Sequence, residues 1–366
     1  MSDLSITGGQ TDLHITGGRI VSGGVQGAPT LDATGLRVVP GFVDLQCNGA
    51  VGIDLSTEPE RLWEVAAGLP RWGVTAWLPT IITSPAEIRG RALAAIRAGP
   101  PDDRPRAVPL GLHLEGPFLS SDRRGAHPPE YLAAPDPRIV VRESWPGAVA
   151  LVTLAPELPA AADVVRELAA AGIVASAGHS NATAAEARAG IDAGITYVTH
   201  LFNAMAPLHH REPGLAGVAL TDDRVRAGIV ADGVHVDPTM LALAASALGD
   251  RLTLVTDAVA ALGAPDGSVS LSTQRAEATN GAVRLPDGTL AGSTLSMDEA
   301  IRNLTSVPPE AALRAATSAP AAVLGDETRG TLTPGARGDV VLLDATGRVA
   351  ATVIAGRVAW ESRWRR

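Results

Sequence analysis

Eight short apolar runs alternate with Ala-, Arg- and Glu-rich segments through the middle of the chain. Such nearly continuous apolar runs are typical of strands buried on both faces, and their alternation with helices favours a parallel sheet. Eight such units within about 220 residues predict an α/β fold of the (β/α)8 barrel type, and an open doubly wound sheet is the alternative. The runs are 42–45, 74–80, 107–115, 149–155, 173–178, 195–200, 226–232 and 252–257. Helical patterns fall at 59–68, 84–98, 159–171, 182–193 and 238–248.

The two ends of the chain have a different pattern. Residues 1–39 and 330–366 contain short Thr- and Val-rich stretches separated by glycine turns, and neither end is long enough for a stable sheet of its own. We therefore predict one small, discontinuous β-sandwich domain built from both termini, with the barrel of residues 40–329 inserted between them. Residues 265–292 read as a β excursion from the barrel, because Pro-Asp-Gly turns punctuate them. Two further helices are expected at 297–306 and 309–318.

Composition narrows the classes of function. The 366 residues carry 30 basic and 39 acidic side chains, and the net charge of −9 argues against nucleic acid or an anionic membrane as a partner. Every Lys+Arg position is an arginine, which excludes Schiff-base catalysis, a P-loop and a metal pair bridged by a carboxylated lysine. A single cysteine is typical of a cytoplasmic protein, and we expect neither a signal peptide nor a membrane-spanning segment.

Ionisable residues collect where the predicted strands end. Glu115 ends the third run, His179 directly follows the fifth, His200 ends the sixth and Asp257 ends the eighth. Because the active site of such a barrel lies at the C-terminal ends of its strands, we expect these side chains to meet. One carboxylate and two imidazoles suit a divalent metal, with an open position for water. Asp257 is then placed to take the proton of the attacking water, and its structural alternative is the cap of a following helix.

The end of the first run bears on the number of metals. Many barrel metallohydrolases carry His-x-His here to hold a second ion, whereas this chain has Gln46 and Asn48, which are poor zinc ligands. We therefore predict one divalent ion per chain, with Zn²⁺ expected and Fe, Co or Mn as alternatives. Gln46 is a candidate contact to the water at the metal.

Two loops hold further candidates. The polar loop 119–132 leaves the site directly and has the composition of a lid. Its His127 is a candidate partner for a bound carbonyl, and Arg211, after the sixth run, is a candidate fork for a phosphate or carboxylate. A surface position is the structural alternative for both residues.

Taken together, the motifs resemble the N-acetylglucosamine-6-phosphate deacetylases, a branch of the amidohydrolase superfamily, in their single-metal subset. They follow the family's order and cover nearly the whole predicted barrel, and the β segments at the termini agree with the family's split second domain. The matching strings are PGFVDLQCNG at 40–49, LHLEGPF at 112–118, RGAHPP at 124–129, SAGHSNAT at 176–183, THLFNAMAPLHHREPGLAG at 199–217, DGVHVD at 232–237, VTDA at 255–258 and LAGSTLSMDEA at 290–300.

The resemblance implies a role for each matching site residue. Glu115, His179 and His200 would bind the metal. Asp257 would be the catalytic acid and base, and His127 would help to polarise the acetyl carbonyl or hold the sugar. The implied contacts to the phosphate, the sugar hydroxyls and one wall of the site are Asn203, the backbone of Ala204, Arg211, His235 and the backbone region of Leu295.

The implied reaction is hydrolysis of the acetamide of N-acetyl-D-glucosamine 6-phosphate to D-glucosamine 6-phosphate and acetate. A homodimer is also implied, in which Arg211 can serve the neighbouring subunit. Three alternatives stay open: a deacetylase of another amino-sugar phosphate such as N-acetylgalactosamine 6-phosphate, a cyclic amidohydrolase, and a scaffold barrel without catalysis. The missing lysine and His-x-His count against the second, and the four retained strand-end residues count against the third.

Overall fold

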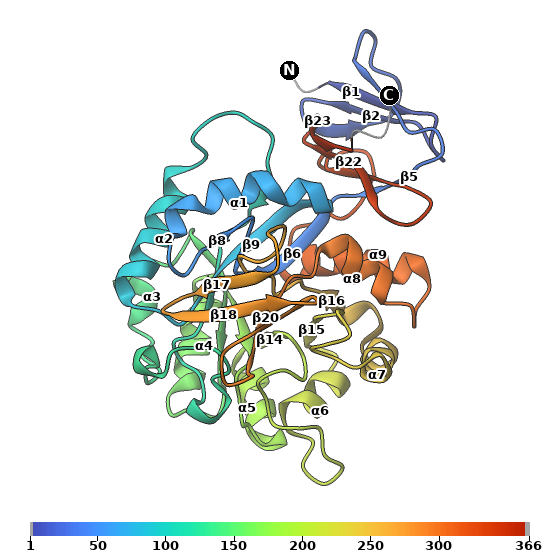
Figure 1. Ribbon diagram of the computed structural model, residues 1–366. Helices are drawn as coiled ribbons and strands as arrows, with labels where there is room; N and C mark the ends of the chain where they lie inside the picture. Colours follow the sequence, from blue (N-terminus) through green and yellow to red (C-terminus); the bar gives the residue numbers. More distant parts are fainter. Residues whose placement is uncertain (1–2, 363–366) are drawn as a thin grey trace.

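The computed structural model describes residues 3–362. A parallel sheet curls around its centre with helices on the outside, so the predicted (β/α)8 barrel is confirmed (Figure 1). Its strands are β6 (Phe42–Cys47), β9 (Val74–Ile82), β10 (Val108–Pro109), β11 (Leu112–Glu115), β12 (Val149–Leu154), β13 (Val174–Ala177), β14 (Ile195–Val198), β15 (Arg226–Ile229) and β16 (Leu252–Leu254). The sheet order is β10-β9-β11-β12-β13-β14-β15-β16, and β6 pairs with β9.

The barrel closes just beyond its first and last strands. Cys47 forms a parallel bridge with Ala258, and the Asp257 N–H donates to the carbonyl of Gln46 at 2.9 Å. One layer deeper, the buried carboxyl of Asp44 accepts a hydrogen bond from Thr256 Oγ1 at 2.6 Å. This closure places the end of β6 directly beside Asp257.

Helices cover the outside of the barrel. They are α1 (Leu62–Gly68), α2 (Ala86–Ala98), α3 (Ile139–Arg142), α4 (Ala161–Ala170), α5 (Ala184–Ala193), α6 (Gly214–Thr221), α7 (Pro238–Leu248), α8 (Met297–Asn303), α9 (Pro309–Ala316) and α10 (Ser318–Val323). Local sequence sets several of their starts: Thr183 and Glu186 form a capping box before α5, and Asp237 caps α7 ahead of Pro238. The sequence pattern misses α6, because almost all of its residues are apolar and buried and it has no polar face to give a helical period.

The two ends of the chain form two four-stranded sheets that pack on each other (Figure 1). The first has the order β3-β2-β1-β4, with β1 (Leu4–Thr7), β2 (Leu13–Thr16), β3 (Arg19–Val21) and β4 (Thr30–Asp32). The second has the order β23-β22-β21-β5, with β5 (Arg37–Pro40), β21 (Val340–Leu343), β22 (Val349–Ile354) and β23 (Arg357–Glu361). Residues from both termini share one apolar core, for example Ile6 and Ile15 with Val340 and Val353. The limits of the sandwich at residues 39 and 330 stay predictions.

An antiparallel sheet leaves the barrel after Asp257, in the segment expected to be a β excursion. Its strands are β17 (Gly267–Leu271), β18 (Gln274–Thr279), β19 (Ala282–Arg284) and β20 (Leu290–Ser293). Between β18 and β19, Asn280 and Gly281 form a two-residue turn with positive φ at both positions, 51° and 83°. A small hairpin of β7 (Gly49–Ala50) and β8 (Ile53–Asp54) lies beneath the sheet, and the buried Asp54 carboxylate accepts from the Ser272 N–H at 2.7 Å. No helix within residues 3–362 is long and apolar enough to cross a membrane.

Candidate active site

The ionisable strand-end residues meet at the C-terminal mouth of the barrel. Glu115 is the last residue of β11, whereas His179, His200 and Asp257 lie two or three residues beyond β13, β14 and β16. These three residues all have positive φ, at 49°, 26° and 49°. L-residues rarely adopt such a backbone, and it turns each side chain inward where the strand stops. No helix follows Asp257 before α8 in the described chain, so the helix-cap alternative for this residue is wrong.

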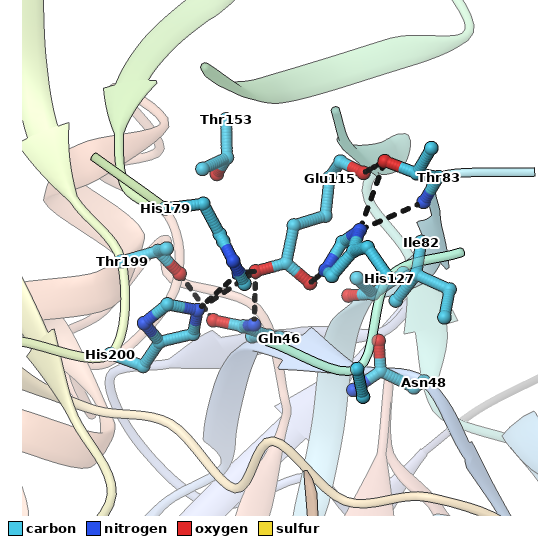
Figure 2. A network of polar contacts seen from close by, with 12 residues as sticks. Gln46, Asn48, Ile82, Thr83, Glu115, His127, Thr153, His179, Thr199 and His200 are labelled. Atoms are coloured by element: carbon cyan, nitrogen blue, oxygen red, sulfur yellow. Dashed lines mark hydrogen bonds and ion pairs between the residues drawn. The ribbon is translucent and has the colours of Figure 1, made fainter. Parts of the chain in front are cut away.

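Three of these side chains form a compact, buried cluster, shown in Figure 2. One ligand atom from each of Glu115, His179 and His200 lies within 4.8 Å of the others. Oε1 of Glu115 is 3.1 Å from His179 Nε2 and 2.9 Å from His200 Nε2, and the two imidazole nitrogens are 3.0 Å apart. Burial opposes ionisation of Glu115, but its close contacts with the surrounding imidazoles hold its pKa well below the ordinary value.

The surroundings of the two imidazoles fit a metal site. Nδ1 of His179 lies 2.9 Å from the carbonyl oxygen of Arg123, which can only accept, so Nδ1 carries the proton and Nε2 is left with a free lone pair toward the cluster. Within residues 3–362, Nδ1 of His200 is buried without a hydrogen-bond partner, and its Nε2 faces Glu115 in the cluster. An anionic oxygen and two imidazole nitrogens in one small volume are a donor set that a divalent cation takes.

Gln46 and Asn48 both donate to Asp257. Nε2 of Gln46 lies 3.2 Å and Nδ2 of Asn48 lies 2.7 Å from Oδ1 of Asp257, so neither bond uses Oδ2. Gln46 also donates to Glu115 Oε1 at 3.0 Å, and its own oxygen accepts from Thr199. With its oxygen engaged, Gln46 turns N–H groups toward the two carboxylates. Burial and the charge of Glu115 raise the pKa of Asp257 above its ordinary value.

His127 reaches the cluster from loop 119–132. Its Nδ1 accepts from the Thr83 N–H at 3.2 Å, so in the neutral ring the proton is on Nε2. That Nε2 faces Oε2 of Glu115 at 3.6 Å, which is too long for a hydrogen bond. Burial lowers the pKa of His127 to about 4. The ring therefore presents a neutral N–H donor at the edge of the site.

A cavity of about 460 Å³ opens over this cluster, a volume in the usual range of small-molecule sites. Of the predicted site residues, the structure brings eight to its lining: Glu115, His127, His179, His200, Asn203, Ala204, His235 and Asp257. His235 is held from behind, because its Nδ1 contacts the Asp232 carboxylate at 2.6 Å, and its Nε2 is left for other contacts. Gln46 lies beneath the cavity, where it supports Glu115 and Asp257.

Arg211 and Leu295 are not brought into this lining. Arg211 is exposed on the segment before α6, outside the cavity. The backbone N–H of Leu295 donates to Ser293 Oγ at 3.0 Å, and its side chain is buried behind the wall. The wall expected from Leu295 is made instead by the neighbouring β20 residues Ala291 and Gly292.

Sequence reasoning missed several residues of the lining. The sequence indicates for Asn48 only that it is a poor metal ligand, whereas the structure shows that it contacts Asp257 and lines the cavity. Arg123 and Arg284 also line the cavity and are absent from the predicted site. Arg123 stood next to the RGAHPP motif, and a polar lid over a strand end is a usable signal. The sequence holds no comparable signal for Arg284, because this residue lies at the barrel mouth only through the fold of residues 265–292.

Comparison with known proteins agrees with this site. The model of the amidohydrolase family matches residues 37–359. A relative from Bos taurus named N-acetylglucosamine-6-phosphate deacetylase is 42% identical over 352 residues, covering 90% of this chain and 85% of the relative. A relative from Escherichia coli O157:H7 named N-acetylgalactosamine-6-phosphate deacetylase is 39% identical over 330 residues, covering 87% of each.

A solved structure extends the likeness to the whole fold. It is a mutant N-acetyl-D-glucosamine-6-phosphate deacetylase from Mycobacterium smegmatis, in complex with N-acetyl-D-glucosamine-6-phosphate. The two structures align with a TM-score of 0.87 at 34% identity, over 98% of this chain and 100% of that one. The matching family model, the high identity along nearly the full chain and the shared fold agree, and the chain therefore belongs to the amidohydrolase family, in the branch of the N-acetylglucosamine-6-phosphate deacetylases.

Proposed function

We propose that the protein hydrolyses the acetamide of N-acetyl-D-glucosamine 6-phosphate, releasing acetate and D-glucosamine 6-phosphate. The observation that carries the proposal is the buried cluster of Glu115, His179 and His200 beside Asp257, at the floor of a cavity sized for a small molecule. Relatives of this identity and coverage that bear the deacetylase name support the same substrate class.

In this proposal Glu115, His179 and His200 hold one divalent ion, most simply Zn²⁺. Such an ion lowers the pKa of water toward 7 and polarises an amide carbonyl. The donor set suits zinc, and Fe, Co and Mn accept the same ligands. A second ion is disfavoured because the oxygen of Gln46 already accepts from Thr199 and Asn48 presents its Nδ2 to Asp257.

Asp257 moves the proton. Its Oδ1 is held by the amides of Gln46 and Asn48, which leaves Oδ2 to take a proton from the attacking water. The same oxygen then gives that proton to the departing amine, because an amine leaves poorly unless it is protonated. Nε2–H of His127 donates to the carbonyl oxygen as negative charge develops there.

The other lining residues orient the sugar phosphate. Asn203, Ala204 and His235 line the cavity, where the Asn203 side chain, the Ala204 backbone and Nε2 of His235 suit phosphate and hydroxyl oxygens. Arg211 lies outside the cavity of its own chain, and we propose that it serves the neighbouring site of a homodimer. A cytoplasmic location is part of the same proposal, and its support is the single cysteine, which is buried.

A second substrate is supported by one specific observation. The Escherichia coli relative at 39% identity is named for N-acetylgalactosamine 6-phosphate, which differs only at the sugar's C4. Both epimers present the same acetamide and the same phosphate, so the cluster itself does not separate them.

The test is a deacetylation screen of N-acetylglucosamine and N-acetylgalactosamine, each with and without the 6-phosphate. Acetate release is measured with the metal-loaded protein and after chelation. We expect the fastest turnover on N-acetylglucosamine 6-phosphate and no turnover after chelation. Faster turnover on the galactosamine epimer would move the assignment to the second substrate. Full activity after chelation would contradict the metal-dependent mechanism.

A further inference from the structure

The first barrel strand, β6, is irregular at the end that reaches the active site. Its register with β9 shifts between Asp44 and Cys47, in the stretch that carries Gln46. Such an irregularity disrupts the ladder locally and is common beside active sites. On its other side, β6 is joined to β16 by no ladder within residues 3–362. The seam of the barrel therefore depends on individual hydrogen bonds.

The carboxylate of Asp44 supplies three of the acceptors at this seam. Its Oδ1 accepts from the backbone N–H of Gln46 at 3.2 Å and from that of Thr256 at 3.3 Å. Its Oδ2 accepts from the Thr256 hydroxyl at 2.6 Å. A carboxylate offers only acceptors, and all three partners are donors. One buried side chain thus joins the end of β6 to the segment that follows β16.

The segment that Asp44 holds is the turn that carries Asp257. Thr256 directly precedes Asp257, whose backbone is left-handed with a φ of 49°. Ser293 of β20 holds the same turn from another side. Its N–H donates to the Asp257 carbonyl at 2.9 Å, and its hydroxyl donates to the Thr256 carbonyl at 2.6 Å. Loss of the Asp44 contacts would therefore leave the turn attached to β20 but no longer fixed to β6.

We propose that Asp44 is a positioning residue for the proton transfer that Asp257 performs. This inference rests on the proposed function, which gives Asp257 its role. Asp44 is buried and is not part of the cavity lining, so it acts on the reaction through the backbone. It holds the Gln46 N–H and the Thr256 turn in one arrangement, and this arrangement sets where Oδ2 of Asp257 lies. A misplacement of about 1 Å can cost about 10²-fold in rate.

Asp54 provides a matched control within the same chain. Its buried carboxylate also accepts from the backbone N–H two residues further on, that of Ser56 at 2.9 Å, and from a distant backbone N–H, that of Ser272 at 2.7 Å. Asp44→Asn and Asp54→Asn thus make the same chemical change at two similarly bonded carboxylates. Only Asp44 is bonded to the turn that carries Asp257.

Thr256 tests the same contact from its other partner. Thr256→Val removes the hydroxyl at nearly constant volume, whereas Thr256→Ser keeps the hydroxyl and loses one methyl group. Asp44→Asn and Thr256→Val disturb the same hydrogen bond, so their effects on kcat should not multiply when the two changes are combined.

The experiment measures kcat and KM for acetate release from N-acetylglucosamine 6-phosphate, together with the metal content and the urea midpoint of each variant. Assays run at about pH 8, because burial raises the pKa of Asp44 to about 7 and the carboxylate must be ionised to accept all three bonds. For Asp44→Asn and Thr256→Val we expect kcat to fall about 10–100-fold, with KM and metal content near wild type. The double variant should fall no further than the weaker single variant. Thr256→Ser should restore most of kcat, and Asp54→Asn should keep it whatever its urea midpoint.

The possible failures can be told apart. An unchanged kcat in Asp44→Asn and Thr256→Val, losses that multiply in the double variant, or an equal loss in Asp54→Asn would each overturn the inference and leave the proposed function standing. If Asp44→Asn does not fold, the Thr256→Val and Thr256→Ser pair decides by the same criteria. Wild-type protein that releases acetate from none of the four sugars in the screen would show that the proposed function is wrong, and this inference would fall with it.

Discussion

His179, His200 and Asp257 share an unusual backbone, and this matters for how the site is built. A non-glycine residue in the left-handed region costs about 1–3 kcal/mol, and it persists only where the surroundings enforce it. Here the enforcing contacts are specific: the Arg123 carbonyl for His179, and the amides of Gln46 and Asn48 for Asp257. The groups that we propose to hold the metal and move the proton are thus fixed by the fold before a substrate arrives, which is the preorganisation that catalysis requires.

Asp257→Asn should abolish turnover while sparing metal and substrate binding. The amide is nearly isosteric with the carboxylate but cannot accept the proton of water, and proton-transfer groups contribute about 10²–10⁴ in rate. Steady-state kinetics, metal analysis and substrate binding by calorimetry check this. A variant that keeps more than about a tenth of the wild-type rate would require a different base.

His179→Ala should lose both the metal and the activity, because it removes one of three ligand atoms. Gln46→Ala is the comparison, since its amide donates to Glu115 and Asp257 without supplying a ligand atom to the cluster. We expect about one divalent ion per chain in wild type and in Gln46→Ala by elemental analysis. Two tightly held ions per wild-type chain would contradict the single-metal proposal.

At the scale of single residues, the sequence predicts which residues reach the site when they directly follow a barrel strand. It does not predict residues that reach the site only because a distant segment folds back over the barrel. The ends of predicted strands in a barrel share one rim, so Glu115, His179, His200 and Asp257 could be placed together from the pattern alone. Arg284 lies beyond the last strand, on a sheet whose return depends on tertiary packing. Arg211 lies in a matching motif, yet its position outside the cavity depends on the path of a loop. The hydrophobic periodicity of the sequence does not predict that path.

At the scale of elements, a buried carboxyl group, that of Asp54, joins the β7–β8 hairpin to the sheet of β17 to β20. Asp54 of the β7–β8 hairpin accepts from the backbone N–H groups of Ser56 and Ser272, and its burial raises its pKa to about 6. An acid with a raised pKa in the folded state holds its proton longer there than in the unfolded chain. Its contribution therefore favours folding below about pH 4 and is lost as the pH rises through 6.

Asp54→Asn should remove this pH dependence. Relative to wild type, the free energy of unfolding of the variant should rise by up to about 3 kcal/mol between pH 4 and pH 7, from the shift of Asp54 alone. Asp44, whose pKa burial raises to about 7, stays in both proteins and cancels in the difference. Urea unfolding at a series of pH values measures it. A difference that stays constant with pH would mean that Asp54 titrates normally.

Element types were largely predictable, because strands buried on both faces and amphipathic helices leave clear periods in the sequence. The Pro-Asp-Gly turns likewise located the excursion sheet. The pattern failed where burial removes the period, as in α6. There the deciding information is what the segment packs against.

At the scale of the whole molecule, the position of Arg211 makes a prediction about assembly. If Arg211 serves the partner's site in a homodimer, then co-expressed Arg211→Ala and Asp257→Asn chains should regain activity that neither variant has alone. Random pairing puts one intact site in each mixed dimer, which restores about a quarter of the wild-type sites. Co-purification with two different tags isolates the mixed dimers for the assay. Mixed dimers that stay inactive would place Arg211 in its own chain's site or give it only a structural role.

The split β-sandwich also sets an order of events in the cell. Strands β1 to β5 leave the ribosome before the barrel, whereas their core partners β21 and β22 are made after the whole barrel. At about 5–20 residues per second the first sheet waits roughly 15–60 s with its apolar face uncovered. The nascent chain therefore passes through a stage in which a completed barrel carries an unfinished, aggregation-prone sheet. A stop codon that removes only β21 to β23 would leave every residue of the cavity in place and still produce a chain that protein quality control is expected to destroy.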